Sequence, residues 1–583
     1  MFDPSARAQR GLPGLRPGVS GLAGLLFAAL LVAPGGAGGV AAAGPAGSTG
    51  GTAAAAGDSA GARRTTTLGP IVGSVSGDTY AWRGIPYVKA PTGARRWRPP
   101  VPHRPWTAPL TTQRFGDGCP QPGRFFSPSP NGPRYDLDVR EGLGKPVGKE
   151  DCLTLNVFRP ATTQQDLPVI VFIHGGSNTV GYSADPMYDG RRLAKRANAV
   201  VVTLNYRVGL FGWMDAQSLK TGEPKNDSGN FGTLDQIEAL KFVNANARTF
   251  GGSADNVTVM GESAGSVNVW ALLVSPLTKG LVDKALPMSG GFQFTTQAAS
   301  KVWAEGYVDK AVREARKDED TSDVAAYLRS KSADYLVDLL LRNPQMNQNP
   351  PAVIPDGVVL PRDPHVAVAQ GQYRKVPVLA GNMLEEGKLF GSLISAYRPT
   401  DYDRFTKQYR YDPDHPTGTA GDYLKDTFLP VDRAGGWNDA SAALGDAVFT
   451  PLTLDSMNTL QAAGGSQLYY YQFAWNQEPA PFCKVYGAVH AMDLPFAFGN
   501  FGRSVYSFAF SEKNWPGRAE LSDLFMTSIR QFVRTGSPQN ARLGRTWAQW
   551  PNTMVLDATN AHASTTLLPA PTTQAGQDIT TCS

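Results

Sequence analysis

The chain has 583 residues, with 55 basic and 50 acidic side chains and a formal net charge of +5. Because these charges nearly balance, and because no long basic run or basic-aromatic alternation occurs, nucleic acid is not expected as a partner. The length would allow several domains, but no internal repeat is visible, and large α/β enzymes often form one continuous unit.

The N-terminal segment predicts an exported protein. Arginines, an apolar run over residues 22–32 and three alanines form the pattern of a signal peptide over residues 1–43. The apolar run is short for a membrane span, so we expect no stable membrane insertion after cleavage, with an uncleaved anchor as the alternative. Residues 44–64 are rich in Gly, Ala and Ser and predict a flexible linker, followed by a single domain over residues 65–583. We therefore expect secretion to the periplasm or the extracellular medium.

The cysteine content fits export, because disulfides persist in oxidising compartments. Four cysteines allow three pairings, and we expect two bridges, Cys119 with Cys152 and Cys483 with Cys582. The alternatives are four free thiols or a zinc site, but the wide spacing without a Cys-x-x-Cys pair disfavours zinc. No metal is expected.

The first predicted elements are strands and a helix. Residues 71–75 and 80–87 alternate in the manner of a peripheral hairpin. The apolar runs at 169–173, 200–204 and 256–260 have the length of strands that are covered on both faces of a sheet. Between the last two runs, apolar residues recur every three positions and predict a helix; they are Leu234, Ile237, Leu240 and Val243.

The second half of the chain predicts further strands and the walls of a pocket. Residues 376–380 and 468–473 have strand character, and a closing helix is expected over 521–533. Residues 300–370 and 391–465 are mostly helical in pattern. Long excursions of this kind usually stand above the carboxyl ends of the strands of a sheet.

The strand at 256–260 leads directly into Gly261-Glu-Ser-Ala-Gly265. A serine between two such glycines, after a strand and before a helix, is typical of a nucleophile elbow, where the hydroxyl projects beside the first helical N–H groups. The same pattern around Ser59 has no strand before it and is assigned to the linker. The alternative for Ser263 is a turn serine that caps the following helix.

Several further blocks occur in order along the chain. They are Arg83-Gly-Ile-Pro-Tyr87, Pro91-Thr-Gly93, Glu150-Asp-Cys-Leu-Thr-Leu-Asn156, His174-Gly-Gly176, Asn205-Tyr-Arg-Val-Gly209, Gly229-Asn-Phe-Gly-Thr-Leu-Asp-Gln236 and Phe250-Gly-Gly252. As a set, they resemble the type-B carboxylesterase/lipase family, the cholinesterase-like branch of the α/β-hydrolases, and the likeness runs from about Gly73 to beyond Trp550. The resemblance implies that residues 65–583 form an α/β-hydrolase catalytic domain, with a large, mostly parallel sheet flanked by helices and with helical cap insertions.

The resemblance also implies a Ser-His-Glu triad, in the chain order of this fold. Ser263 is the expected nucleophile, and the block Gly487-Ala-Val-His-Ala-Met-Asp-Leu-Pro495 matches the family's histidine loop, which makes His490 the base. The family's Asp-Glu-Gly is represented by Glu385-Glu-Gly387, so Glu386 is the expected acid. Glu385 is the alternative.

The expected oxyanion donors are the backbone N–H groups of Gly176, Ser177 and Ala264. Relatives commonly have an aromatic residue at the position of Asn178, so we expect the pocket to lose one apolar wall there. The resemblance further implies a buried polar network beside the triad, with a purely structural role as the alternative; its expected members are Glu262, Ser289 and Asp493.

These features together predict a secreted serine hydrolase that cleaves carboxylic esters through an acyl-enzyme, without metal or organic cofactor. The expected substrate is a small-molecule or lipid ester. A lipase or sterol esterase is the nearest alternative. A non-catalytic cholinesterase-like binding or adhesion protein is less favoured, because such proteins typically lose a triad residue.

Overall fold

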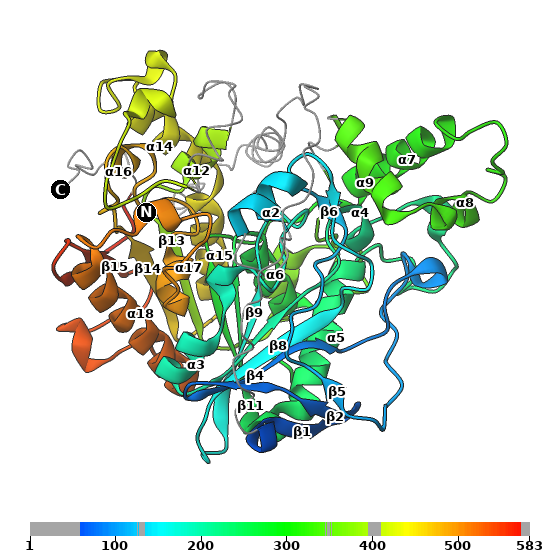
Figure 1. Cartoon of the computed structure of the whole chain (residues 1–583), viewed down its shortest axis with the longest axis horizontal. Coiled ribbons are helices and arrows are strands. Elements are labelled where there is room, and N and C mark those ends of the chain that lie inside the picture. Colours follow the sequence, from blue (N-terminus) through cyan, green and yellow to red (C-terminus); the bar gives the residue numbers. More distant parts are fainter. Residues whose placement is uncertain are drawn as a thin grey trace, which may run out of the picture.

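The computed structural model describes residues 59–124, 126–127, 135–343, 345–346, 350, 352–393, 408 and 410–572. The expected signal peptide, residues 1–43, lies outside the described residues. A large twisted sheet stands at the centre of the molecule, with helices on both faces and above it (Figure 1). No helix in the described part of the chain is both long and apolar enough to cross a membrane.

The central sheet contains eleven strands. Neighbouring strands run parallel from β10 across to β15, whereas β16, β8, β4 and β3 pair with their neighbours antiparallel. In spatial order the strands are β16 (Ala563–Leu568), β15 (Thr553–Ala558), β14 (Leu468–Phe473), β13 (Val378–Met383), β12 (Lys284–Met288), β11 (Gly252–Glu262), β9 (Leu167–Ile173), β10 (Val200–Leu204), β8 (Thr154–Pro160), β4 (Thr79–Pro86) and β3 (Ser74–Ser76). Two small sheets lie outside it, made of β1 (Arg63–Thr66), β2 (Gly69–Val72) and β5 (Leu110–Thr111), and of β6 (Gln121–Pro122) and β7 (Pro146–Val147).

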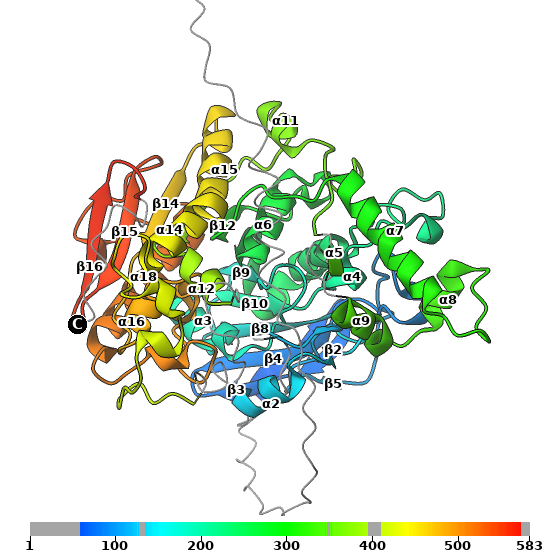
Figure 2. The ribbon, with the colours of Figure 1, turned by 90° about the horizontal axis from the view of Figure 1, so that it is seen from above.

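Helices cover both faces of the central sheet, as the view from above shows (Figure 2). One face carries α3 (Arg191–Ala197), α17 (Asp493–Phe498) and α18 (Trp515–Thr535); the other carries α5 (Phe231–Asn246), α6 (Ala264–Val274), α11 (Pro364–Ala369) and α15 (Thr450–Ala462). Successive side chains of a strand point to opposite faces. In β9, therefore, Ile170 and Phe172 enter the core under α3 and α18, while Val169 and Val171 enter the core under α5 and α6.

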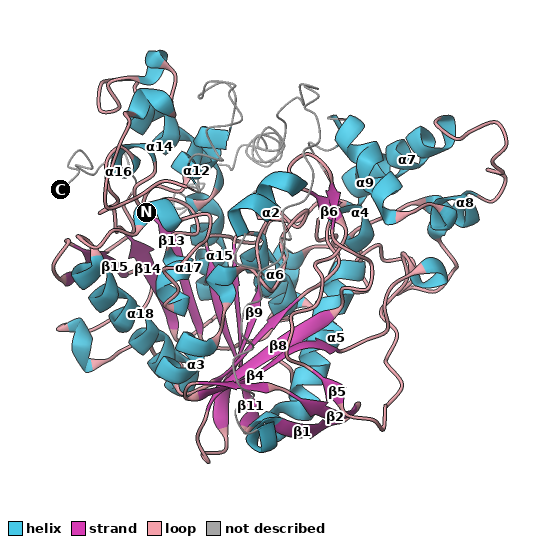
Figure 3. Ribbon diagram, in the orientation of Figure 1, coloured by secondary structure: helices cyan, strands magenta, loops and turns pink. Residues whose placement is uncertain are grey.

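The remaining helices are connecting or cap elements. They are α2 (Tyr135–Gly142), α4 (Gly209–Gly212), α7 (Gln297–Arg313), α8 (Val324–Ser330), α9 (Ala333–Arg342), α12 (Gly387–Leu393), α14 (Trp437–Val448) and α16 (Phe482–Val485). The helices α7, α8 and α9 project to one side of the strands (Figure 3), and they bury a hydrophobic cluster around Tyr307 and Leu336 together with Trp97, α4 and the start of α5. The expected helical character of residues 300–370 is therefore confirmed.

Most predicted strands are present, with two corrections. The predicted strands at 200–204 and 468–473 coincide with β10 and β14, and the other central strands are present with shifted ends. The predicted hairpin is present, but its first strand is divided: residues 74–75 lie in β3, which pairs antiparallel with β4, whereas Ile71 belongs to β2 in a separate small sheet. Residues 410–436 are mostly turns rather than helix, because Pro413, Pro416 and Pro430 interrupt that segment.

The folded structure begins earlier than the expected linker end at residue 64. A short 3₁₀ turn covers Ser59–Ala62, and β1 starts at Arg63. Ala62 is fully buried, and its carbonyl accepts hydrogen bonds from Trp82 Nε1 at 2.7 Å and from the N–H of Gly73 at 3.0 Å. These contacts attach Ala62, a residue of the expected linker, to the domain.

The expected bridge between Cys119 and Cys152 is confirmed, with a Cα–Cα distance of 5.0 Å. Cys483 is also disulfide-bonded. Its expected partner, Cys582, lies outside the described residues. The confirmed bridge joins the segment before β6 to the segment before β8.

The turn between β11 and α6 leaves no room for side chains at its glycines. A Cβ atom on Gly265 would lie 2.1 Å from the carbonyl oxygen of Ile173, and one on Gly261 would lie 2.4 Å from the carbonyl oxygen of Gly265. Both contacts are with backbone, which cannot rotate away. The strand and the helix therefore pack closely only because Gly261 and Gly265 have no side chain.

Replacing Gly265 by Ala should destabilise the protein, because the new methyl group must displace the backbone of β9; overpacking of this kind costs about 1–3 kcal/mol. Thermal unfolding followed by circular dichroism would show a lower midpoint. Gly502→Ala is the matched control, since a Cβ there meets nothing within 4 Å. Equal midpoints for the two variants would contradict this account of the turn.

Candidate active site

Ser263 occupies the turn between β11 and α6. Its backbone has φ +57° and ψ −122°, a conformation that non-glycine residues rarely adopt and that costs on the order of 1–3 kcal/mol. Its N–H donates to Met288 at 2.9 Å, and its carbonyl accepts from Val267 at 3.0 Å, so the strained turn is held from both sides. The side chain makes no capping hydrogen bond to the helix, which excludes the alternative of a capping serine.

Glu386 and His490 meet although they are 104 residues apart in the chain. Nδ1 of His490 lies 2.5 Å from Oε2 of Glu386, and Oε1 of Glu386 accepts from the N–H of Met383 at 2.9 Å and from Asn382 at 3.0 Å. Burial raises the pKa of Glu386, but the charge of His490 and these hydrogen bonds, with a contribution from the Ser289 hydroxyl, lower it more. The net pKa is below the usual range, so the carboxylate form is favoured.

Glu385 has different partners. It forms a buried ion pair with Lys388, and its Oε2 accepts from the N–H of Ala488 at 2.7 Å. The first of the two neighbouring glutamates thus contacts the backbone of the histidine loop, whereas Glu386 contacts the imidazole itself. This geometry favours Glu386 over Glu385 as the acid.

The other imidazole nitrogen faces Glu262. Nε2 of His490 lies 3.1 Å from Oε1 of Glu262 without the alignment of a hydrogen bond, and no hydrogen bond joins it to Ser263. Burial, with the charges of Asp493 and Glu386, raises the pKa of Glu262 well above its usual range, so its neutral form is favoured. Catalytic hydrogen bonds often tighten only when substrate is bound.

Aromatic rings and a tyrosine hydroxyl surround the imidazole. The rings of Phe390 and Phe449 each lie 4.7 Å from that of His490, centroid to centroid. Tyr506 donates from its hydroxyl to the carbonyl of His490 at 2.5 Å. Sequence reasoning missed all three residues, because nothing in their local pattern distinguishes them from ordinary core aromatics.

The expected polar network is only partly assembled. Asp493 lies at the start of α17 and accepts a hydrogen bond from the Tyr471 hydroxyl at 2.7 Å. Burial raises the pKa of Asp493 to about 7. Ser289 follows β12 with φ +54°, and its N–H donates to Gly381 at 2.8 Å. These residues and Glu262 place several buried polar groups behind the imidazole, but no direct hydrogen bond links Glu262 to Asp493 or to Ser289.

The loop after β9 presents two backbone donors. Gly176 and Ser177 have φ +100° and +56°, and no described residue accepts a hydrogen bond from either N–H. The carbonyl of Gly176 accepts from Thr179 and Val180, both at 3.0 Å, which fixes the loop. Ala264 is the first residue of α6, where an N–H has no intrahelical acceptor. A Cβ on Gly175 would lie 3.0 Å from Cβ of Ser263, so this loop adjoins the serine.

Asn178 does not simply open the pocket, as the sequence led us to expect. It is 2% exposed, its Oδ1 accepts from Nδ2 of Asn268 in α6 at 2.8 Å, and its carbonyl accepts from Gly209 at 2.6 Å. Its φ of +57° is one that Asn tolerates better than most residues. The side chain therefore connects the donor loop to the helix that begins beside Ser263.

The other histidines that follow Ser263 do not approach the site. His365 is exposed, and the side chains of His415 and His562 are 85% and 83% exposed. Within the described residues, no group of three or more His, Cys, Asp or Glu side chains is arranged to hold a metal ion.

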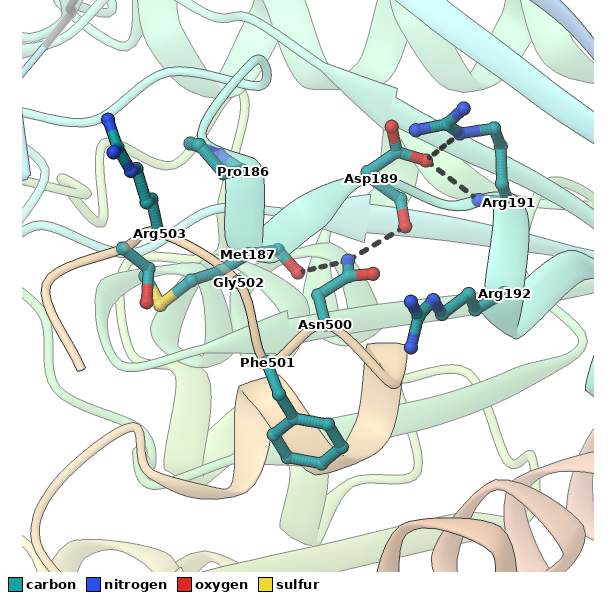
Figure 4. A pocket seen from close by; sticks show the side chains of 10 residues that line it. Pro186, Met187, Asp189, Arg191, Arg192, Asn500, Phe501, Gly502 and Arg503 are labelled. Carbon is teal, nitrogen blue, oxygen red and sulfur yellow. Dashed lines mark hydrogen bonds and ion pairs between the residues drawn. The ribbon is translucent and has the colours of Figure 1, made fainter. Parts of the chain in front are cut away.

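A cavity of about 260 Å³ lies away from this site, between α3 and the segment after α17 (Figure 4). Asp189 pairs with Arg191 at its edge, and Asn500 donates to the carbonyls of Met187 and Asp189 at 3.0 and 2.9 Å. It contains neither the serine nor a histidine, so it is not the candidate active site.

The comparison with known families agrees with this geometry. The model of the carboxylesterase family matches residues 60–575. The chain belongs to the carboxylesterase family. It is a carboxylic ester hydrolase.

The relatives of this carboxylesterase cover most of its length. The para-nitrobenzyl esterase of Bacillus subtilis (strain 168) is 32% identical over 514 residues, which cover 85% of this chain and 94% of that protein. The fumonisin B1 esterase of Sphingopyxis macrogoltabida is 31% identical over 471 residues, covering 79% and 78%. The solved structure of a PNB esterase matches with a TM-score of 0.68 at 27% identity, covering 87% of this chain and 97% of that chain. The carboxylesterase therefore has the α/β-hydrolase fold.

The choice between the two glutamates of this carboxylesterase can be tested by amide replacement. Glu386→Gln should lower kcat by about 10⁴-fold, as expected when the partner that orients a catalytic histidine loses its charge. Glu385→Gln keeps an acceptor for Ala488 and should lower kcat by less than about 100-fold. Both rates would be measured with a p-nitrophenyl ester; the reverse ranking would assign the acid to Glu385.

The contact between Asn178 and Asn268 should matter for oxyanion binding. Asn178→Ala and Asn268→Ala should each lower kcat by about 10-fold, because the donor loop of this carboxylesterase loses its connection to α6. Each should also weaken inhibition by a trifluoromethyl ketone, whose adduct carries an oxyanion.

A double variant and a control complete the test. If the two amides act through their mutual hydrogen bond, the Asn178→Ala/Asn268→Ala variant should be no worse than either single variant. Asn244→Ala, which removes a half-buried amide in α5, should behave as the wild type. An unchanged inhibition constant in both single variants would show that the contact does not affect the donors.

Proposed function

We propose that this carboxylesterase is secreted and that it cleaves esters through an acyl-enzyme on Ser263, with His490 as the acid-base and Glu386 as the residue that orients it. The observation that carries the proposal is the buried contact of 2.5 Å between His490 and Glu386, together with a serine in a strained turn whose hydroxyl caps no helix. An orienting carboxylate fixes the tautomer in which Nε2 can accept a proton.

In the first half-reaction, Oγ of Ser263 attacks the ester carbonyl carbon while Nε2 of His490 takes the hydroxyl proton. Nε2 makes no hydrogen bond to Glu262 or to another described residue, so its lone pair can accept this proton. The carbon–oxygen bond to the alcohol then breaks, and the imidazolium returns the proton to the leaving alcohol. In the second half-reaction, water attacks the acyl-enzyme with His490 again as base, which releases the acid and restores the serine.

The negative charge on the carbonyl oxygen is accepted by the N–H groups of Gly176, Ser177 and Ala264. The support for this assignment is that the first two N–H groups have no described acceptor and that the third begins a helix, whose positive end favours an anion. Fixed donors of this kind need no reorganisation as the charge develops.

The proposed substrates are small-molecule carboxylic esters. The relatives named above are called a para-nitrobenzyl esterase and a fumonisin B1 esterase, and a third relative, a human protein 31% identical to this chain, is called a cocaine esterase. Lipid esters, the substrates of a lipase or sterol esterase, are the alternative. Secretion is supported by the disulfide between Cys119 and Cys152 and by the signal-like residues 1–43.

The acyl-enzyme proposal predicts one reactive serine. The mature protein, treated with a fluorophosphonate probe, should carry a single covalent adduct on Ser263 by mass spectrometry. Ser263→Ala should carry none, whereas Ser266→Ala, the control for a buried serine one turn further along α6, should be labelled as the wild type. Folded wild-type protein without an adduct would instead favour the non-catalytic binding protein.

A further inference from the structure

Lys388 is a buried lysine in the first turn of α12. It is fully buried, and its ammonium pairs with Glu385, with side chains that are each 1% exposed. Burying two charges costs several kcal/mol per ion, so such a pair is unfavourable unless each charge is well satisfied. The neighbouring Glu478 does not share the charge, because burial raises its pKa well above the usual range and favours its neutral form.

The ion pair contacts α16 and the histidine loop that follows it. Nζ of Lys388 donates to the carbonyl of Lys484 at 3.3 Å, and Oε2 of Glu385 accepts from the N–H of Ala488 at 2.7 Å. The backbone of Glu385 also donates to the carbonyl of Ala488 at 2.9 Å. The loop approaches so closely that a Cβ on Gly487 would lie 1.9 Å from Oε2 of Glu385.

These contacts end two residues before His490. The segment from Lys484 to Ala488 is therefore attached to the residues on either side of Glu386, which itself contacts the imidazole. A change in the attachment moves the imidazole relative to both Glu386 and Ser263. Misplacement by about 1 Å can lower a catalytic rate by roughly 100-fold.

We propose that Lys388 and Glu385 are positioning residues for the histidine loop: their buried ion pair fixes the distance between His490 and the segment after β13 that carries Glu386. Lys388 acts by holding Glu385 in the orientation in which Oε2 faces Ala488, and by contacting the carbonyl of Lys484. The inference rests on the proposed function of His490 as the base.

The test separates positioning from stability. Lys388→Met keeps most of the side-chain volume but leaves Glu385 buried without a counter-charge, so it should lower both the thermal midpoint and kcat. Lys388→Met/Glu385→Gln removes both charges and should recover much of the midpoint. If the pair positions His490, the double variant should still have a kcat that is roughly 10- to 100-fold below that of the wild type, with KM for a p-nitrophenyl ester nearly unchanged.

Lys241→Met is the matched control, because Lys241 forms an ion pair of the same i,i+3 spacing with Glu238 on the surface of α5. It should change neither kcat nor the midpoint. A double variant with the kcat of the wild type would overturn the proposal and leave the pair a purely structural role. A Lys388→Met variant with a lower thermal midpoint but an unchanged kcat would overturn it as well. If Lys388→Met does not fold, the double variant alone decides between the two roles.

The failure of this inference can be told apart from failure of the proposed function. Wild-type protein that hydrolyses the ester and is labelled on Ser263 establishes the reaction, whatever the Lys388 variants do. Wild-type protein that neither hydrolyses the ester nor is labelled on Ser263 would remove the function on which the inference rests. The positioning role would then be overturned together with that function.

Discussion

The attachment of the histidine loop to the end of β13 is the constraint on which the rest of the site depends. Ser263 and the donor loop are placed mainly by the central strands β11 and β9, which directly precede them in the chain. His490 is not, because 104 residues separate it from Glu386 and more than twice that number separate it from Ser263. Its place is determined by contacts between distant segments, and neighbouring glutamates make the principal ones: Glu385 to the loop backbone and Glu386 to the ring.

These contacts place several carboxyl groups close together in the protein interior. Such an arrangement is tolerable only because the groups differ in their surroundings. Glu386 has hydrogen-bond donors and the imidazole, and its charged form is favoured. Glu262 and Asp493 lack comparable donors, and burial raises the pKa of each. One negative charge is therefore directed at the imidazole, while the neighbouring acids add little repulsion below neutral pH.

The site also concentrates backbone strain. Ser263, Ser177, Asn178 and Ser289 all have positive φ, as does Ala491 next to the histidine. Each is held by neighbouring hydrogen bonds or by close packing, which is how strained conformations persist at functional sites. The strain and the buried charges are thus supported by the same framework, the carboxyl edge of the parallel strands and the helices that cover it.

The sequence predicted those parts of the molecule whose signal is local. Val200–Leu204 is apolar except for Thr203 and forms β10, and the glycines around Ser263 predict a tight turn. The edge strand β16 was not predicted, because its Ser and Thr residues are half exposed and lack an apolar run. The role of Asn178 was misjudged, because it depends on a hydrogen bond to the distant Asn268. The role of Lys388 was missed, because it depends on contact with the distant segment that precedes His490.

The separate hydrophobic cluster under α7, α8 and α9 has a consequence for where the chain can vary in sequence. Its buried residues form a core distinct from the two that sandwich the central sheet. Alterations confined to that lobe leave the sheet's own packing intact, whereas the backbone around Ser263 admits not even a methyl group at Gly265. Sequence change is therefore tolerated more readily in this peripheral lobe than in the turn that carries Ser263.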